Sequence, residues 1–226
     1  MRVNRTFGSL LGMDNLTNPS IDNEYLCKTI EEILPEDMIN DPDYSFTSDT
    51  VRGFDFLGGD NLHVDKRFDD LFKQIDFSIL TYFKNMSFEK AEYYITKAWA
   101  TYTKKATFIS RHKHVASQYS FVYYVQAEPE IHSPLTFFEP VNGIHVPESI
   151  KWNDDNYKSI KIKPQTGLFI IFPSYIEHGT EKMPETDFAR ISISGDIVIT
   201  AEVGVKSELL FSSPSTWRKL NGPITH

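Results

Sequence analysis

The spacing of apolar residues changes character near residue 90 of this 226-residue chain. Before that point, two segments carry apolar side chains at helical intervals. In residues 22–34 these side chains fall on one helix face, and Pro35 ends the run. In residues 66–84 a longer stripe follows Asp65, which can cap a helix. The stripe consists of Phe68, Leu71, Phe72, Ile75, Ile79 and Phe83. We therefore expect two amphipathic helices whose apolar faces need a sheet to pack on.

Residues 89–200 instead show short runs rich in β-branched and aromatic residues, separated by Pro, Gly, Asn and Asp. The runs are EYYITKAWATYT, TFISRHKH, SFVYYVQ, PLTFFEP, IKIKP, GLFIIFP and ARISISGDIVI. This order predicts a mainly β protein with N-terminal helices (α+β), built as a sandwich or jelly-roll barrel with the helices packed on one sheet. We expect one domain over residues 1–226, in four consecutive parts. They are an N-terminal arm (1–20), helical support (21–88), a β-barrel core (89–200) and a C-terminal segment (201–226).

Composition narrows the classes of partner and the compartment. A formal net charge of −8 argues against sequence-independent binding to nucleic acid, which needs a basic surface. The lone Cys27 excludes an intramolecular disulfide and fits a reducing compartment. The sequence contains no apolar stretch long enough to span a membrane, and its N-terminus is too polar for a signal peptide. We expect a soluble, cytoplasmic protein with neither a nucleic-acid nor a membrane partner.

Three histidines in the β-rich half suggest a metal site. His112 and His114 stand two apart in a run that reads as a β-strand, so their rings should project from the same face. His178 follows the apolar run GLFIIF. Neutral imidazole is a ligand for Fe(II), Zn, Cu and Ni. We expect His178 to bind a metal together with one or both of the other two.

The run ARISIS supplies a candidate site for an organic anion. Strand alternation places Arg190, Ser192 and Ser194 on one face, which would line a ligand cavity in a barrel. If the metal also holds an α-keto acid, the far carboxylate of that acid needs a forked cation and a hydroxyl. Arg190 and Ser192 can supply both. Tyr102 and Tyr124 are further candidate contacts, although an aromatic core would explain them equally well.

In order and spacing, these motifs resemble the 2-oxoglutarate- and Fe(II)-dependent oxygenase superfamily, in the branch related to prolyl hydroxylases that occurs in bacteria and phages. The resemblance lies in AWATYTK, HKHVASQYSFVYYV, GLFIIFPSYIEH and RISIS, and covers roughly residues 90–199. It implies a double-stranded β-helix (jelly-roll, cupin-like) barrel that binds Fe(II) and 2-oxoglutarate and consumes O₂. Such an enzyme hydroxylates a C–H bond of a protein side chain or small molecule and releases succinate and CO₂. A phage-encoded enzyme acting in a bacterial host fits the same branch.

The branch itself shows a His-x-His motif, but the sequence departs from the wider superfamily at this ligand position. Most members of the superfamily have His-x-Asp or His-x-Glu where this chain has His112, Lys113 and His114. Either both histidines complete an all-histidine triad with His178, or only one binds. In the second case, His114 fills the place of the acid if His112 binds, and Ala116 stands there if His114 binds. A missing carboxylate should weaken Fe(II) retention.

Two further departures affect the substrate side of the pocket. Phe121 stands where the branch usually has glycine, and Val115 stands where it often has proline.

Two other functions compete with the oxygenase. One is a cofactor-free three-histidine dioxygenase of the thiol-oxidising kind, which needs no Arg190. The other is a non-catalytic jelly-roll binding protein that keeps a relic of the metal site. The sequence identifies neither the prime substrate nor the oligomeric state.

Overall fold

The computed structural model describes residues 10–33, 61–86, 90–103, 108–139, 159–184 and 186–219. Within these ranges the chain is mainly β, as the sequence predicts. The helical elements are α1 (Asn23–Ile33), α4 (Asp69–Asn85) and the 3₁₀ turns η1 (Leu62–Val64), η2 (Lys66–Phe68) and η3 (Pro214–Thr216). The strands are β1 (Gly12–Asn15), β2 (Ala91–Thr103), β3 (Tyr119–Gln126), β4 (Leu135–Phe138), β5 (Ser159–Ile162), β6 (Leu168–Pro173), β7 (His178–Thr180) and β8 (Arg190–Ala201). No helix in the described ranges is long and apolar enough to cross a membrane.

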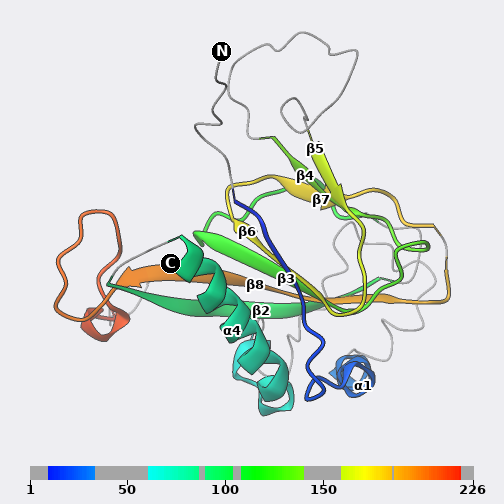
Figure 1. The fold of residues 1–226 in the computed structure, drawn as a ribbon, viewed down its shortest axis with the longest axis horizontal. Helices are drawn as coiled ribbons and strands as arrows, with labels where there is room; N and C mark the ends of the chain where they lie inside the picture. The colour runs from blue at the N-terminus through cyan, green and yellow to red at the C-terminus, as the bar shows by residue number, and fades with distance from the viewer. Residues whose placement is uncertain are drawn as a thin grey trace, which may run out of the picture.

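The described strands form two antiparallel sheets. The larger has the order β1-β6-β3-β8-β2 and the smaller has the order β5-β4-β7. The smaller sheet lies over one side of the larger one, and α1 and α4 lie on the other side (Figure 1). Among the described strands no ladder joins the two sheets into a closed barrel.

Both helices predicted from the apolar spacing are confirmed. The second begins as the 3₁₀ turn η2, where Asp65 accepts a hydrogen bond from the backbone N–H of Arg67 at 3.0 Å, and continues as α4. Its apolar stripe is buried against the larger sheet. At the end of this stripe the Phe83 ring stacks on Tyr93 of β2, with ring centroids 4.4 Å apart. The helices therefore share one hydrophobic cluster with the sheet that they cover.

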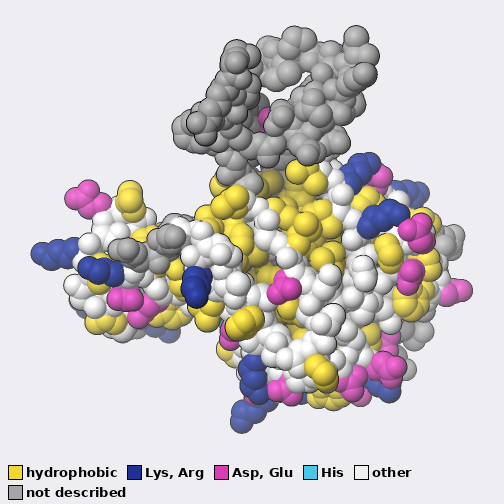
Figure 2. Space-filling model, in the orientation of Figure 1, with side chains coloured by type: hydrophobic (Ala, Val, Ile, Leu, Met, Phe, Trp, Pro, Cys, Tyr) yellow, Lys and Arg dark blue, Asp and Glu magenta, His cyan; other side chains and the backbone are white. Residues whose placement is uncertain are grey.

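The larger sheet separates two hydrophobic clusters. Along β3, Phe121 and Tyr123 belong to the cluster beneath the helices, whereas Val122 and Tyr124 belong to the cluster between the two sheets. This assignment follows the alternation of side chains along a strand. On the face drawn in Figure 2, apolar side chains gather over the region of β4, β6 and β7. Both faces of β3 are buried, which explains why SFVYYVQ reads as a nearly continuous apolar run.

The structure differs from the predicted secondary structure in two segments. Residues 1–20 are predicted as an arm, but Gly12–Asn15 forms β1 and pairs with β6 at the sheet edge. Its sequence, GMDN, has no strand pattern, and its pairing uses backbone groups. The predicted strand TFISRHKH is also wrong in its described part, residues 108–114. These residues are irregular apart from one bridge between His112 and His178.

Candidate metal centre

Three histidine rings meet at one end of the smaller sheet. One ring nitrogen from each of His112, His114 and His178 lies within 4.8 Å of the others. The ring centroids of His112 and His178 are 4.4 Å apart. The ring centroid of His114 lies 5.4 Å from that of His112 and 5.2 Å from that of His178. In the part of the chain that the structure describes, these three form the group of His, Cys, Asp and Glu side chains that could hold a metal.

Backbone contacts hold the irregular histidine segment in place. His112 and His178 exchange backbone hydrogen bonds of 2.9 and 2.8 Å, and the N–H of His114 donates to Ser174 O at 3.0 Å. A Cβ atom at Gly179 would lie 2.7 Å from Ile109 O, closer than real side chains approach. Glycine after His178 therefore lets the segment lie against β7. The two rings of HKH share one side because of this docking, and not because of strand alternation.

The Nδ1 atoms of the triad show which nitrogen each ring offers. His112 Nδ1 donates to Ser110 O at 2.8 Å, and His178 Nδ1 donates to Ile176 O at 2.9 Å. A carbonyl oxygen only accepts, so Nδ1 must carry the proton and Nε2 must carry the lone pair when the ring is neutral. His114 Nδ1 is engaged in the same way, 2.5 Å from Asp196 Oδ1. All three rings therefore offer Nε2 as a possible ligand atom.

Burial keeps His112 and His178 in the form that binds metals. The pKa of His178 is lowered to about 3, chiefly because burial disfavours the imidazolium ion. The pKa of His112 is also lowered, mainly by desolvation of its ring, although this residue is exposed overall. Metal binding requires neutral imidazole, so neither ring has to lose a proton near neutral pH. A donor set of three imidazoles fits a first-row divalent metal such as Fe(II).

His132 shows what a structural histidine looks like in the same fold. Its Nδ1 accepts a hydrogen bond from the backbone N–H of Glu128, and its Nε2 lies 2.9 Å from Phe188 O. Both nitrogens are used by the backbone, so no lone pair remains for a metal. The triad differs because each of its rings uses only Nδ1 in this way.

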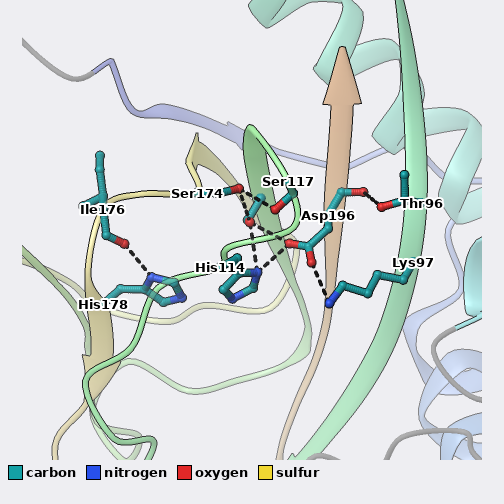
Figure 3. A network of polar contacts seen from close by, with 9 residues as sticks. Thr96, Lys97, His114, Ser117, Ser174, Ile176, His178 and Asp196 are labelled. Atoms are coloured by element: carbon teal, nitrogen blue, oxygen red, sulfur yellow. Dashed lines mark hydrogen bonds and ion pairs between the residues drawn. The ribbon is translucent and has the colours of Figure 1, made fainter. Parts of the chain in front are cut away.

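Asp196, on β8, is a site residue that the sequence prediction missed. It is fully buried, and Figure 3 shows it between His114 and Lys97. Its carboxylate accepts from His114 Nδ1 at 2.5 Å and from Ser120 Oγ at 2.7 Å, and forms an ion pair with Lys97 Nζ at 2.9 Å. Burial alone would raise its pKa, but contacts with these three residues lower it to about 2. The strand face that carries Arg190, Ser192 and Ser194 continues to Asp196, and this alternation of side chains could have revealed Asp196 as a site residue.

A cavity of about 440 Å³ adjoins the triad. Its volume lies in the range typical of small-molecule sites. Besides the three histidines, its lining includes Lys97, Trp99, Lys113, Tyr124, Arg190, Ser192 and Ser194. No Asp or Glu is among the described lining residues, so the cavity is locally cationic although the chain is acidic. Such a field favours a small anion.

Four residues were predicted to contact a keto acid, and the structure brings three of them to the cavity. Arg190 is only 3% exposed, and its Nη1 donates to Ser133 O at 3.4 Å. Ser192 and Tyr124 line the same cavity, and burial raises the pKa of Tyr124 to about 12, so its hydroxyl is a donor. Tyr102 is different. It packs against the cluster beneath the helices, on the other side of the sheet, and is not among the residues that line the cavity.

Residues 97–196 match a family model described as "Putative 2OG-Fe(II) oxygenase". The matched segment contains the whole triad, Arg190 and Asp196. A comparison with curated proteins finds no match. The match confirms the resemblance to 2-oxoglutarate- and Fe(II)-dependent oxygenases, and with it the expected cofactors, Fe(II) and 2-oxoglutarate. The family implies 2-oxoglutarate and O₂ as co-substrates.

Several solved structures have a similar fold. HygX from Streptomyces hygroscopicus, with nickel and 2-oxoglutarate bound, has a TM-score of 0.53 and 12% identity, covering 87% of this chain and 84% of that chain. SnoN, a non-heme α-ketoglutarate-dependent epimerase from nogalamycin biosynthesis, has a TM-score of 0.52 and 12% identity, covering 96% and 88%. A Pseudomonas putida prolyl-4-hydroxylase has a TM-score of 0.50 and 14% identity, covering 82% and 91%. At these identities the likeness shows the fold alone.

Proposed function

We propose that this chain is a single-domain Fe(II)- and 2-oxoglutarate-dependent oxygenase with its active site at the mouth of a double-stranded β-helix. In this proposal the strands of residues 89–200 form the jelly-roll barrel, and β1 adds to one edge of its larger sheet. The observation that carries the proposal is the presence of Arg190 in one cavity with three histidines whose Nε2 atoms are available. One half of that arrangement suits a metal, and the other half suits the far end of an α-keto acid.

His112, His114 and His178 would hold Fe(II) as an all-histidine triad. Their docking fixes the ring positions before the metal arrives, since His112 and His178 are joined through the backbone. Bound Fe(II) and 2-oxoglutarate together supply the oxidising chemistry: O₂ is consumed, 2-oxoglutarate becomes succinate and CO₂, and a C–H bond of a second substrate becomes C–OH. Apolar rings of Phe137 and Phe172 pack around His178 and limit the access of water to it.

Arg190 would bind the distal carboxylate of 2-oxoglutarate. A guanidinium presents two parallel N–H groups to a carboxylate, and this contact is stronger in a partly dry cavity. The hydroxyls of Ser192 and Tyr124 lie along the same cavity and can donate to the same carboxylate. Lys113 adds positive charge near the entering dianion, whereas the charge of Lys97 is paired with Asp196. A cofactor-free three-histidine dioxygenase does not need Arg190, whereas the distal carboxylate of 2-oxoglutarate does, so Arg190 in this cavity favours the 2-oxoglutarate enzyme.

Hydroxylation of a protein side chain or a small molecule is proposed from the motif resemblance. The neighbours of similar fold include both a prolyl-4-hydroxylase and an α-ketoglutarate-dependent epimerase, so the fold is compatible with more than one second substrate.

Turnover of 2-oxoglutarate without a second substrate tests the proposal. Purified protein supplied with Fe(II), ascorbate, O₂ and 2-oxoglutarate should form succinate slowly, and His178→Ala should abolish this reaction. His63→Gln, a change to a histidine outside the cavity, is the matched control and should retain it. Succinate formation that is equal in wild type and His178→Ala would contradict the assignment of the site.

A further inference from the structure

We infer that Asp196 is a positioning residue that acts through His114. Its carboxylate fixes the His114 ring with Nε2 toward the metal. It also supplies, from behind that ring, the negative charge that most members of the superfamily place directly on the metal. This inference rests on the proposed function, because it takes His114 as a ligand. Asp196 does not itself bind the metal but contacts a residue that does. The inference predicts that the effect of Asp196 on metal affinity depends on having a histidine at position 114.

The first support is the isolation of the carboxylate from water. Asp196 has no exposed surface, and burying a charge is costly unless that charge is paired and hydrogen bonded. Its Oδ1 accepts from His114 and Ser120, and Lys97 lies 2.9 Å from Oδ2. Lys97 reaches this carboxylate from the rim of the cavity, where its side chain is 39% exposed.

The second support comes from counting protons in the serine chain. Ser120 Oγ contacts Asp196 Oδ1, Ser174 Oγ and His114 Nδ1. Ser174 Oγ in turn contacts Ser117 Oγ at 2.8 Å (Figure 3). Each hydroxyl has one proton, and an ionised carboxylate can only accept. Ser120 donates its proton to Asp196, so Ser174 donates to Ser120 and Ser117 donates to Ser174. The chain is ordered toward Asp196, which suits a carboxylate that must stay ionised in a dry place.

The third support is the rigidity of the strand that carries Asp196. β8 lies between β3 and β2, and Asp196 is paired with Ser120 on one side and Lys97 on the other. A register shift between Ile95 and Lys97 brings Lys97 opposite Asp196, and Thr96 Oγ1 contacts Asp196 O at 3.3 Å. Residues of both neighbouring strands therefore fix the position of the carboxylate. A group that orients a metal ligand has to be fixed in this way.

A purely stabilising role explains the network less well. Replacing a buried ion pair by apolar side chains is often neutral or stabilising, so such pairs are poor devices for stability alone. In addition, His114 gives the network only Nδ1, while its ring lines the cavity beside His112 and His178. A carboxylate on the far nitrogen makes the ligand nitrogen more basic, and losing such a partner costs about 10–100-fold in metal affinity.

Titration with Co(II) under anaerobic conditions tests the inference, with the visible spectrum of the bound ion as the readout. Asp196→Asn should weaken Co(II) binding about 10–100-fold. Asp76→Asn, the same chemical change on α4 outside the cavity, is the control and should leave binding unchanged. The decisive comparison uses His114→Asp, which restores the commoner His-x-Asp sequence. In that background Asp196→Asn should change Co(II) affinity less than about threefold, since the ring that transmits its effect is gone.

The possible results separate this inference from the proposed function. If His178→Ala abolishes Co(II) binding but Asp196→Asn has no effect, or an equal effect in both backgrounds, Asp196 is not a positioning residue and the proposed site stands. If the wild type itself binds no Co(II), both claims fail. A second measurement needs no variant: long-range ¹H–¹⁵N correlation in the metal-free protein should show His114 protonated at Nδ1. Protonation at Nε2 would overturn the inference even if Asp196→Asn failed to fold.

Discussion

Phe121 lies directly opposite Gly195 in the β3–β8 ladder, and its ring occupies the space that a side chain at 195 would need. A Cβ atom built on Gly195 would lie 2.4 Å from Phe121 Cζ and 2.8 Å from Lys97 O. The ring of Phe121 is therefore accommodated by a glycine on the neighbouring strand. This contact between Phe121 and Gly195 lies directly beside Asp196, whose position depends on the same stretch of β8.

Gly195→Ala should destabilise the protein by about 1–3 kcal/mol, the usual cost of overpacking a buried site. The free energy of unfolding, measured with urea, tests this. Phe121→Leu in the same chain should recover part of the loss, because it removes the ring contact but leaves the backbone contact with Lys97 O. Strictly additive effects of the two changes would show that the pair is not coupled.

Single alanine variants of the triad distinguish the ligand arrangements that the sequence leaves open. His178→Ala should remove Fe(II) binding while the far-ultraviolet circular dichroism stays unchanged, because a cavity-lining ring carries little of the packing. With an all-histidine triad, His112→Ala and His114→Ala should each weaken Fe(II) binding severely. Wild-type Fe(II) affinity in one of these two variants would remove that residue from the ligand set.

Arg190→Ala should raise the dissociation constant of 2-oxoglutarate by at least tenfold and leave Fe(II) binding nearly unchanged. Removing one partner of a charge-assisted contact in a partly dry cavity costs about 2–5 kcal/mol, and each 1.4 kcal/mol is about a factor of ten. Arg190→Lys should be intermediate, since an ammonium group cannot reproduce the fork. Calorimetric titration of the Fe(II)-loaded variants without O₂ measures all three constants. Equal affinity in the wild type and Arg190→Ala would favour the three-histidine dioxygenase or the non-catalytic protein.

The metal-free protein should lose stability as the pH falls from 6.5 toward 3. The pKa of His178 in the folded chain is lowered to about 3 from its usual 6.5, so over this interval the unfolded chain binds more protons than the folded one. The free energy of unfolding therefore rises with pH across the interval, and the contribution of His178 is complete above 6.5. His178→Gln should show a shallower loss between pH 6.5 and 4.5 in urea titrations. An unchanged slope would show that His178 does not stay neutral in the folded protein.

The sequence predicts the helices because their apolar side chains repeat at helical intervals. It predicts the strands β2, β3, β6 and β8 of the larger sheet because they are short runs rich in β-branched and aromatic residues. It cannot predict β1, whose pairing with β6 depends on backbone groups at a sheet edge. The wrong prediction for the histidine segment is more informative. The strand rule predicts two rings on one face, and the rings do lie together, but long-range backbone bonds between His112 and His178 place them there.

Within the site, alternation along β8 is enough to predict that Arg190 and Ser192 share one face. It gives no sign that Tyr102 faces the helices, since a tyrosine suits either side of β2. Asp196 was missed for a different reason. Its partners, Ser120 and Lys97, are far from it in sequence and meet it only through the registers of β3 and β2.

The most direct test of the account is the visible absorbance of the protein mixed with Fe(II) and 2-oxoglutarate in the absence of O₂. When 2-oxoglutarate chelates a protein-bound Fe(II), a metal-to-ligand charge-transfer band appears that neither component gives alone. The wild type should show this band, His178→Ala should lack it at every concentration, and Arg190→Ala should show it only at much higher 2-oxoglutarate. A wild-type protein that binds Fe(II) and 2-oxoglutarate without the band, or binds neither, would contradict the shared site on which the account depends.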